Sequence, residues 1–178
     1  MEKKKIVWLS GGEFPNNARS PVLPHAKCAR KWYNVIRLLF GGNYDISKDC
    51  FCKYDRKYNL GVEVEVDECT TVDAEDFLEA DIAVVATYTY GDGELPDEIV
   101  DFYEDLAGLD LNGKIYGVVG SGDTFYDEFC KAVDDFDRVF AATGAVKGSE
   151  CVKVDLSAED EDIEKLEAFV EELAAKVG

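Results

Sequence analysis

Strand-length apolar runs alternate with amphipathic helical segments from residue 61 to the end of this chain. The clearest strands are residues 62–67, in which apolar and acidic residues alternate, and the continuously apolar runs 81–87 and 114–120. A continuous apolar strand is typical of a parallel sheet that is covered on both faces. The alternation therefore predicts an α/β fold with helices on both sides of the sheet.

Two further strands complete a predicted sheet of five. Residues 5–10 are expected to form the first, central strand, and residues 145–155 the last. Asp73 is expected to cap a short helix that reaches Ala80, and Ser157 to cap the final helix, because both side chains accept hydrogen bonds from free N–H groups. The apolar stripe predicted for that final helix consists of Ile163, Leu166, Val170, Leu173 and Val177.

The segment 11–59 departs from this pattern. A strand-to-helix connection usually takes 2–6 residues, whereas here Pro15, Pro21 and Pro24 delay the next helix. We predict helices over residues 25–40 and 47–60, either of which can make the crossover to the second strand. We interpret residues 1–178 as one domain in which 11–59 is an atypical basic segment or insertion.

Charge is distributed unevenly along the chain, whose formal net charge is −19. Residues 1–60 carry 12 Lys and Arg against 5 Asp and Glu, whereas residues 61–178 carry 7 against 33. The acidic part would repel nucleic acid phosphates and favours docking to basic protein surfaces. The alternative is that the acidity only maintains solubility. The chain begins with no apolar signal segment, so we expect a cytoplasmic protein with reduced cysteines.

Two distinctive loops follow the carboxyl ends of predicted strands, where open parallel sheets bind ligands. The first reads Thr87-Tyr88-Thr89-Tyr90-Gly91-Asp92-Gly93-Glu94, and the second Gly120-Ser121-Gly122-Asp123-Thr124-Phe125-Tyr126, followed by Phe129-Cys130 and Ala132-Val133-Asp134. From Leu60 onward the chain resembles the short-chain flavodoxins, with their aromatic-Gly-Asp loop and their Gly-x-Gly-Asp-x-x-Tyr loop.

The resemblance implies a flavodoxin-like three-layer sandwich with strand order 2-1-3-4-5. It implies a monomeric, low-potential one-electron carrier with non-covalently bound FMN, no substrate of its own, and a reductase and an electron acceptor as partners. The residues assigned to the cofactor are Ser10, Tyr88, Thr89, Tyr90, Gly91, Asp92, Ser121, Gly122, Asp123, Tyr126, Phe129 and Cys130.

Specific roles follow from the same resemblance. Tyr90 and Tyr126 sandwich the flat flavin ring, for which aromatic faces are suitable partners. The peptide at Gly91 flips when the flavin takes its first electron, and a glycine makes positive φ inexpensive. Acidic residues near the ring would lower the second reduction potential. They are Asp92, Glu94, Asp97, Asp127 and Glu128.

The phosphate-binding loop of flavodoxins, broadly Thr-x-Thr-Gly-x-Thr after the first strand, is missing here. Glu13 has the wrong charge for a phosphate, and Pro15 has no N–H to donate. A substitute anion-binding site for the phosphate could be formed by backbone and side-chain groups of Ser10, Gly11, Gly12, Asn16, Asn17, Arg19 and Ser20. The alternative is a flavodoxin-like scaffold that binds partners but little or no FMN.

The cysteines leave a further alternative open. Cys69, Cys130 and Cys151 are expected to be small buried apolar residues. His25, Cys28, Cys50 and Cys52 have the donor types of a zinc site but no established spacing, and unligated thiols are the favoured interpretation. A metal-stapled or nucleic-acid-contacting module grafted on the acidic domain is a further alternative, favoured only by the basic first third of the chain. A phosphoacceptor receiver domain is disfavoured, because Ser10, Thr87 and Asp155 are not its catalytic residues.

Overall fold

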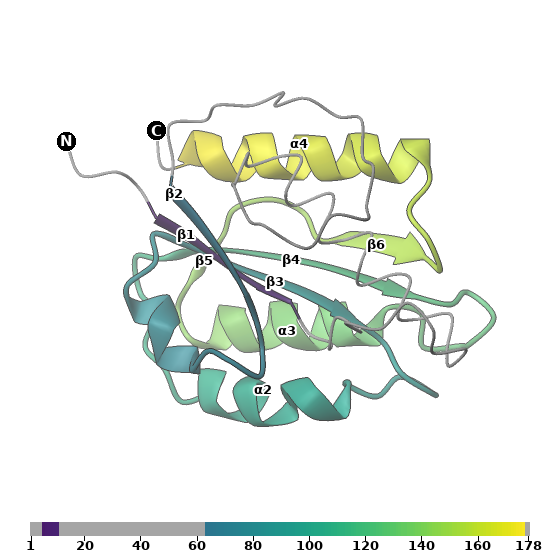
Figure 1. Cartoon of the computed structure of the whole chain (residues 1–178), viewed down its shortest axis with the longest axis horizontal. Coiled ribbons are helices and arrows are strands. Elements are labelled where there is room, and N and C mark those ends of the chain that lie inside the picture. The colour runs from purple at the N-terminus through teal and green to yellow at the C-terminus, as the bar shows by residue number, and fades with distance from the viewer. Residues whose placement is uncertain (1–4, 11–62, 177–178) are drawn as a thin grey trace, which may run out of the picture.

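The sheet of this molecule is parallel throughout and has helices on both faces (Figure 1). The computed structural model describes residues 5–10 and 63–176. Its strands are β1 (Lys5–Ser10), β2 (Glu63–Glu68), β3 (Ile82–Tyr88), β4 (Ile115–Gly122), β5 (Val146–Lys147) and β6 (Val152–Asp155). They lie in the order β2-β1-β3-β4-β5, with β6 also pairing with β4. The predicted central position of residues 5–10 agrees with the pairing of β1 to both β2 and β3.

The last predicted strand, 145–155, is interrupted, so the described sheet has six strands rather than five. Ile115 pairs with Val146, whereas Val119 pairs with Val152. The outer strand therefore carries two more residues than β4 over the same distance, and an excess of this kind cannot stay in a continuous ladder. The chain leaves the sheet after Gly148, whose N–H still donates to the Tyr116 carbonyl at 2.9 Å.

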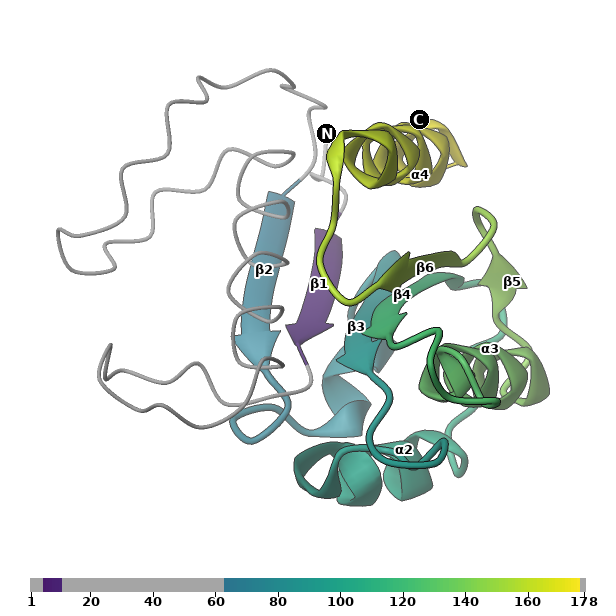
Figure 2. The same cartoon turned by 90° about the vertical axis from the view of Figure 1, so that its right-hand side faces the viewer.

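Two layers of helices enclose the sheet (Figure 2). The 3-10 helices η1 (Ala74–Leu78) and η2 (Asp97–Ile99) and the α-helices α2 (Val100–Leu106), α3 (Lys131–Ala142) and α4 (Asp160–Lys176) complete the described elements. α2 and α3 lie on one face and α4 on the other. No helix among the described residues is both long and apolar enough to cross a membrane.

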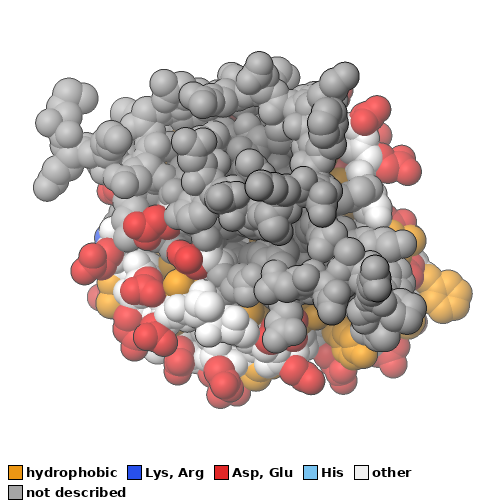
Figure 3. Space-filling model, viewed as in Figure 1, with side chains coloured by type: hydrophobic (Ala, Val, Ile, Leu, Met, Phe, Trp, Pro, Cys, Tyr) orange, Lys and Arg blue, Asp and Glu red, His pale blue; other side chains and the backbone are white. Residues whose placement is uncertain are grey.

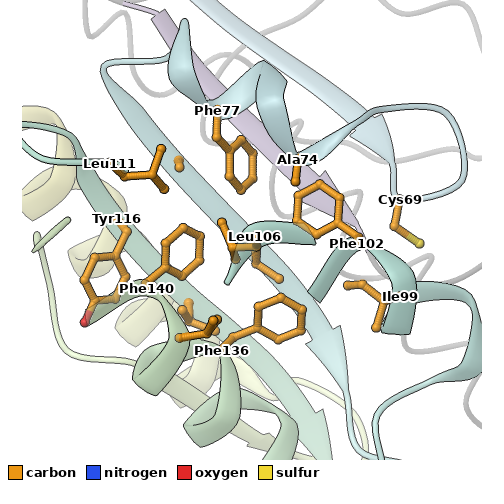
Figure 4. Close-up of a cluster of buried hydrophobic side chains, with 14 of the residues drawn as sticks. Cys69, Ala74, Phe77, Ile99, Phe102, Leu106, Leu111, Tyr116, Phe136 and Phe140 are labelled. Carbon is orange, nitrogen blue, oxygen red and sulfur yellow. The ribbon is translucent and has the colours of Figure 1, made fainter. Parts of the chain in front are cut away.

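The main hydrophobic core lies between the sheet and helices α2 and α3 (Figure 4). Phe140 stacks on Tyr116 with ring centroids 4.8 Å apart, and on Phe77 at 5.9 Å. Phe102 meets Phe77 edge-on. Aromatic pairs of this geometry add to the stabilisation from buried area, so α2, α3 and η1 are held firmly against β3 and β4.

Several helix boundaries differ from the sequence-based predictions. α4 begins at Asp160 rather than next to Ser157, and the N–H of Glu159, just before it, donates to the Asp162 carboxylate at 3.1 Å. Phe169 of α4 is buried although the predicted stripe omitted it, and Ile163 is only partly buried. Asp73 stands at the N-cap of a 3-10 helix, Ala74–Leu78, that ends short of the predicted Ala80, and its N–H donates to the Asp76 carboxylate at 3.3 Å.

The predictions for residues 11–62 lie outside the described residues. They include the helices 25–40 and 47–60, the substitute anion-binding site after Ser10, and the candidate zinc ligands His25, Cys28, Cys50 and Cys52. Across residues 5–10 and 63–176, no group of three or more His, Cys, Asp or Glu side chains is arranged to hold a metal ion.

Candidate cofactor site

The two distinctive loops leave neighbouring strands at the same edge of the sheet. Tyr88, the last residue of β3, is in register with Ser121 of β4. The Thr89 N–H then donates to the Ser121 carbonyl at 2.9 Å. The loops, 89–96 and 123–130, therefore start side by side at the carboxyl edge, the usual ligand site of such sheets.

The first loop is a tight reversal centred on Gly91-Asp92-Gly93. Tyr90 and Glu94 exchange backbone hydrogen bonds, both of 2.8 Å, and so close the loop at its base. Gly91 has φ of +50° and Gly93 of +109°, and the second value is accessible only to glycine. A Cβ atom at Gly93 would also lie 2.8 Å from the Cβ of Glu128. The reversal consequently presents Tyr90 at its entrance, with 47% of its surface exposed.

Side chains outside this reversal fix both of its ends. The Tyr88 hydroxyl donates to the Glu98 carboxylate at 3.0 Å, linking the end of β3 to η2. Burial, and then the Glu98 carboxylate, raise the pKa of Tyr88 well above its usual value, so its hydroxyl remains protonated and a donor. The Thr89 hydroxyl oxygen accepts a hydrogen bond from the Ala132 N–H at 3.1 Å. These contacts occupy Tyr88 and Thr89, two of the predicted cofactor residues, within the protein itself.

The second loop is a compact turn over residues 123–126. The Asp123 carboxylate accepts a hydrogen bond from the Phe125 N–H at 2.8 Å. The backbone carbonyl of Asp123 accepts another from the Tyr126 N–H at 3.2 Å. Phe125 and Tyr126 meet edge-on with ring centroids 5.4 Å apart. Phe125 is 85% exposed and Tyr126 42% exposed. The turn therefore holds two aromatic rings largely outside the hydrophobic core.

Tyr90 and Tyr126 have the properties required to hold a flat aromatic cofactor. Each follows one of two neighbouring strands, and each leaves nearly half of its surface uncovered by the protein. Most of the other large aromatic side chains of the described core are almost fully buried. Because stacking on an aromatic face requires an accessible ring, these two residues fit the flavin that the sequence predicts.

The remaining predicted residues lie around the base of the two loops. Cys130 is fully buried, and its thiol lies 3.9 Å from the Gly120 carbonyl and 3.7 Å from that of Val154. Burial raises the pKa of Cys130 to about 12. Its side chain thus belongs to the core, as expected for a small apolar residue, and only its backbone remains for a cofactor. Gly122 allows close packing here, because a Cβ at this position would lie 2.8 Å from the Cys130 nitrogen.

The other assigned positions complete the edge. Ser121 is buried, and Phe129 is partly buried against the core. Ser10 ends β1 beside Ala86 of β3. Asp92 is exposed, as are the acidic residues Glu94, Asp97, Asp127 and Glu128, and acidic side chains are frequent on the part of the described surface that faces the viewer in Figure 3. Glu128 also forms an ion pair with Lys131, with 3.3 Å between Nζ and Oε2.

Comparison with known proteins decides the family. The flavodoxin family profile matches residues 54–169, more than half of the chain. The chain belongs to the flavodoxin family. The solved flavodoxin of Streptococcus pneumoniae TIGR4 is 60% identical, with a TM-score of 0.73, over 97% of this chain and 99% of that one.

Two further relatives mark the range of this similarity. The "Probable flavodoxin 2" of Bacillus subtilis is 39% identical over 117 residues, which cover 64% of this chain and 78% of that protein. The sulfite reductase [NADPH] flavoprotein alpha-component of Neisseria meningitidis is 34% identical over 187 aligned positions, which cover 99% of this chain and 31% of that protein. Family and fold together support an electron-transfer flavoprotein role for this flavodoxin.

Sequence reasoning missed two residues that shape the second loop of this flavodoxin. The Asp155 carboxylate, at the end of β6, accepts hydrogen bonds from the Thr124 N–H at 3.1 Å and the Thr124 hydroxyl at 2.8 Å. The available signal was the position of Asp155 at the carboxyl end of the last strand, the same edge to which both loops belong. A sequence separation of 31 residues gave no indication of the contact itself.

Proposed function

We propose that this flavodoxin is a low-potential one-electron carrier that uses non-covalently bound FMN. The observation that carries the proposal is the convergence of two loops from β3 and β4, each with one half-exposed tyrosine, at the carboxyl edge of a parallel sheet. In this proposal the protein is a cytoplasmic monomer and a carrier, with no substrate of its own.

Bound FMN would supply the redox chemistry, because its ring system accepts and returns electrons singly. Tyr90 and Tyr126 would bind the ring by stacking and keep water from its faces. Gly91, already at positive φ, would let the neighbouring peptide reorient without a Cβ penalty. The carboxylates of Asp92, Glu94, Asp97, Asp127 and Glu128 would disfavour added negative charge on the ring and so keep the potential low.

The same acidic side chains suggest how partners approach. Exposed carboxylates beside a cofactor attract a basic protein surface and raise the encounter rate at low ionic strength. The similarity to a sulfite reductase flavoprotein component supports reductase-type partners. We therefore propose a reductase and an electron acceptor that both dock at the carboxyl edge, on surfaces rich in Lys and Arg.

A second candidate function follows from the missing phosphate motif. A buried phosphate without hydrogen-bond donors or a countercharge is costly. If residues 11–20 do not replace the usual loop, the chain is a flavodoxin-like scaffold with weak or no FMN binding. The two exposed tyrosines favour the carrier, because they follow neighbouring strands at the edge where open parallel sheets bind ligands.

The decisive measurement is a visible absorption spectrum of the purified protein, followed by titration of the apoprotein with FMN and fluorescence detection. We expect a flavin band, and quenching with a submicromolar dissociation constant. Riboflavin, which has the ring but no phosphate, is the matched control. Much weaker binding of riboflavin than of FMN would support a functioning phosphate site. A colourless protein that quenches the fluorescence of neither FMN nor riboflavin would contradict the electron-carrier function and favour the scaffold.

A redox titration of the FMN-loaded protein would then test the electron count. Two separate one-electron steps, the second well below the potential of free FMN, are expected. A single two-electron step at the potential of free FMN would contradict the proposed carrier, even if binding is tight.

A further inference from the structure

The end of β6 holds the second loop at two places. The Leu156 N–H donates to the Gly122 carbonyl at 2.7 Å, immediately before the turn. Asp155 accepts two hydrogen bonds from Thr124, immediately after Asp123. Residue 123 is therefore flanked on both sides by contacts to one short segment, although that segment lies more than 30 residues later in the chain.

The backbone at Leu156 supports a specific function for this arrangement. Leu156 has φ of 51°, a left-handed conformation that costs an L-residue with a Cβ roughly 1–2 kcal/mol. The Ser157 N–H donates to the Asp155 carbonyl and so closes a tight turn around Leu156. Strained non-glycine residues persist where the surroundings impose them, and they are concentrated at functional sites. This turn directs the Asp155 carboxylate back to Thr124 as the chain leaves the sheet.

We infer that Asp155 is a positioning residue of the proposed FMN site, whose carboxylate keeps the 123–126 turn in the conformation that presents Tyr126. The inference rests on the proposed function. All three consecutive amides of the turn are engaged, that of Thr124 by Asp155 and those of Phe125 and Tyr126 by Asp123. If the bonds to Asp155 are lost, the hydrogen bonds of the Phe125 and Tyr126 amides to Asp123 remain, but these lie within the turn and do not attach it to β6.

Because the contact between Asp155 and Thr124 is exposed to solvent, its effect on FMN binding can be distinguished from its effect on the stability of the fold. Asp155 and Thr124 are both exposed, and water competes with exposed hydrogen bonds, so that their net contribution to folding is small. A bound ring, by contrast, requires Tyr126 in one orientation, and ordering a loose turn on binding reduces affinity. Loss of the carboxylate should thus weaken FMN binding far more than it weakens the fold.

The test uses the variants Asp155→Ala and Thr124→Val, their combination, and Glu159→Gln as the matched control. Glu159→Gln removes one exposed negative charge four residues away from Asp155, and the Glu159 carboxylate forms no hydrogen bond or ion pair with any described residue. We expect Asp155→Ala to raise the FMN dissociation constant about tenfold, because the loosened turn then has to be ordered on binding. Thr124→Val should raise it less, because the amide contact remains.

The double variant tests whether Asp155 and Thr124 act through their contact with each other. The double variant should bind FMN no more weakly than Asp155→Ala, because the hydroxyl of Thr124 acts only through that carboxylate. Independent, multiplying effects of the two changes would overturn the inference. So would an Asp155→Ala protein whose dissociation constant equals that of Glu159→Gln.

Amide hydrogen exchange in the apoprotein keeps the test independent of the cofactor. The amides of Thr124, Phe125 and Tyr126 should exchange severalfold faster in Asp155→Ala than in Glu159→Gln, while amides of β4 are unchanged. Equal exchange in the two variants would overturn the positioning role. If the wild-type protein binds no FMN, the proposed function fails, and the exchange comparison still decides whether Asp155 orders the turn.

Discussion

The hydroxyl oxygen of Thr89, in the first loop, accepts a hydrogen bond from the backbone N–H of Ala132 at 3.1 Å. Ala132 belongs to the first turn of α3, whose start is otherwise without a side-chain cap, because the preceding residue is Cys130. A threonine from one loop thus caps the helix that follows the other loop. The two loops are therefore one structural unit.

Thr89→Val should destabilise the protein by about 1–2 kcal/mol, the usual cost of a lost helix cap. Ala132 is completely buried, so its N–H would find no water as a substitute. Urea unfolding measures the change. Thr89→Ser keeps the hydroxyl and is the control, and it should stay within about 0.5 kcal/mol of the wild type. Thr89→Val keeps the methyl group and loses only the hydroxyl, so an unchanged stability of this variant would mean that the hydrogen bond to Ala132 does not stabilise the helix.

Replacing Tyr90 or Tyr126 with Ala should weaken FMN binding about tenfold or more. Each ring contact is expected to add roughly 0.5–1.5 kcal/mol beyond the area that it buries. Phenylalanine at either position keeps the ring face and should retain most of the affinity. Leu78→Ala is the matched control, because Leu78 is a similarly exposed apolar residue, at 42%, in η1. If neither alanine variant differs from Leu78→Ala in fluorescence titrations, the stacking role is wrong.

The two glycines of the first loop should respond differently to alanine. Gly93→Ala should cost about 1–3 kcal/mol, since φ of +109° excludes alanine and its Cβ would also meet Glu128 and Lys131. Gly91→Ala should cost about 1 kcal/mol, because φ of +50° is accessible at a moderate penalty and the nearest atom is 3.4 Å away. Urea unfolding of the apoproteins would give this order, and the reverse order would contradict the loop conformation.

The sequence predicted the features that depend on local pattern. The apolar run 81–87 corresponds to β3, and 114–120 to most of β4, because strands buried on both faces need continuous apolar residues. The positions of Tyr90 and Tyr126 at one edge follow from the same argument, since both loops leave carboxyl ends of parallel strands.

The features that sequence analysis missed depend on contacts between distant residues. Residues 147–150 are the polar stretch Lys-Gly-Ser-Glu, but no local pattern shows that β5 and β6 both pair with β4 with two extra residues between them. Likewise, the bonds from Thr89 to Ala132 and from Asp155 to Thr124 join residues that only the tertiary fold brings together.

The final prediction concerns a polar cluster at the opposite end of β4. The Asp137 carboxylate in α3 accepts hydrogen bonds from the Tyr116 hydroxyl at 2.8 Å and from Lys147 Nζ at 3.1 Å. Burial alone would raise the pKa of Asp137, but these two hydrogen bonds and the charge of Lys147 outweigh it and lower the pKa. A carboxyl group whose pKa is lower in the folded state stabilises the fold above its unfolded pKa of about 3.9.

That stabilisation should disappear as the pH falls from about 4 through the lower, folded pKa of Asp137. Asp137→Asn should lower the free energy of unfolding by about 1–2 kcal/mol at pH 7. It should also remove the contribution of Asp137 to the loss of stability at acid pH. The measurement is the free energy of unfolding from pH 2 to pH 7 for wild type, Asp137→Asn and the control Glu104→Gln, which changes an exposed acid of α2. The difference between wild type and Asp137→Asn should shrink below pH 4, whereas that for Glu104→Gln should stay small throughout. A difference that is constant with pH would mean that Asp137 acts by packing and not through its charge.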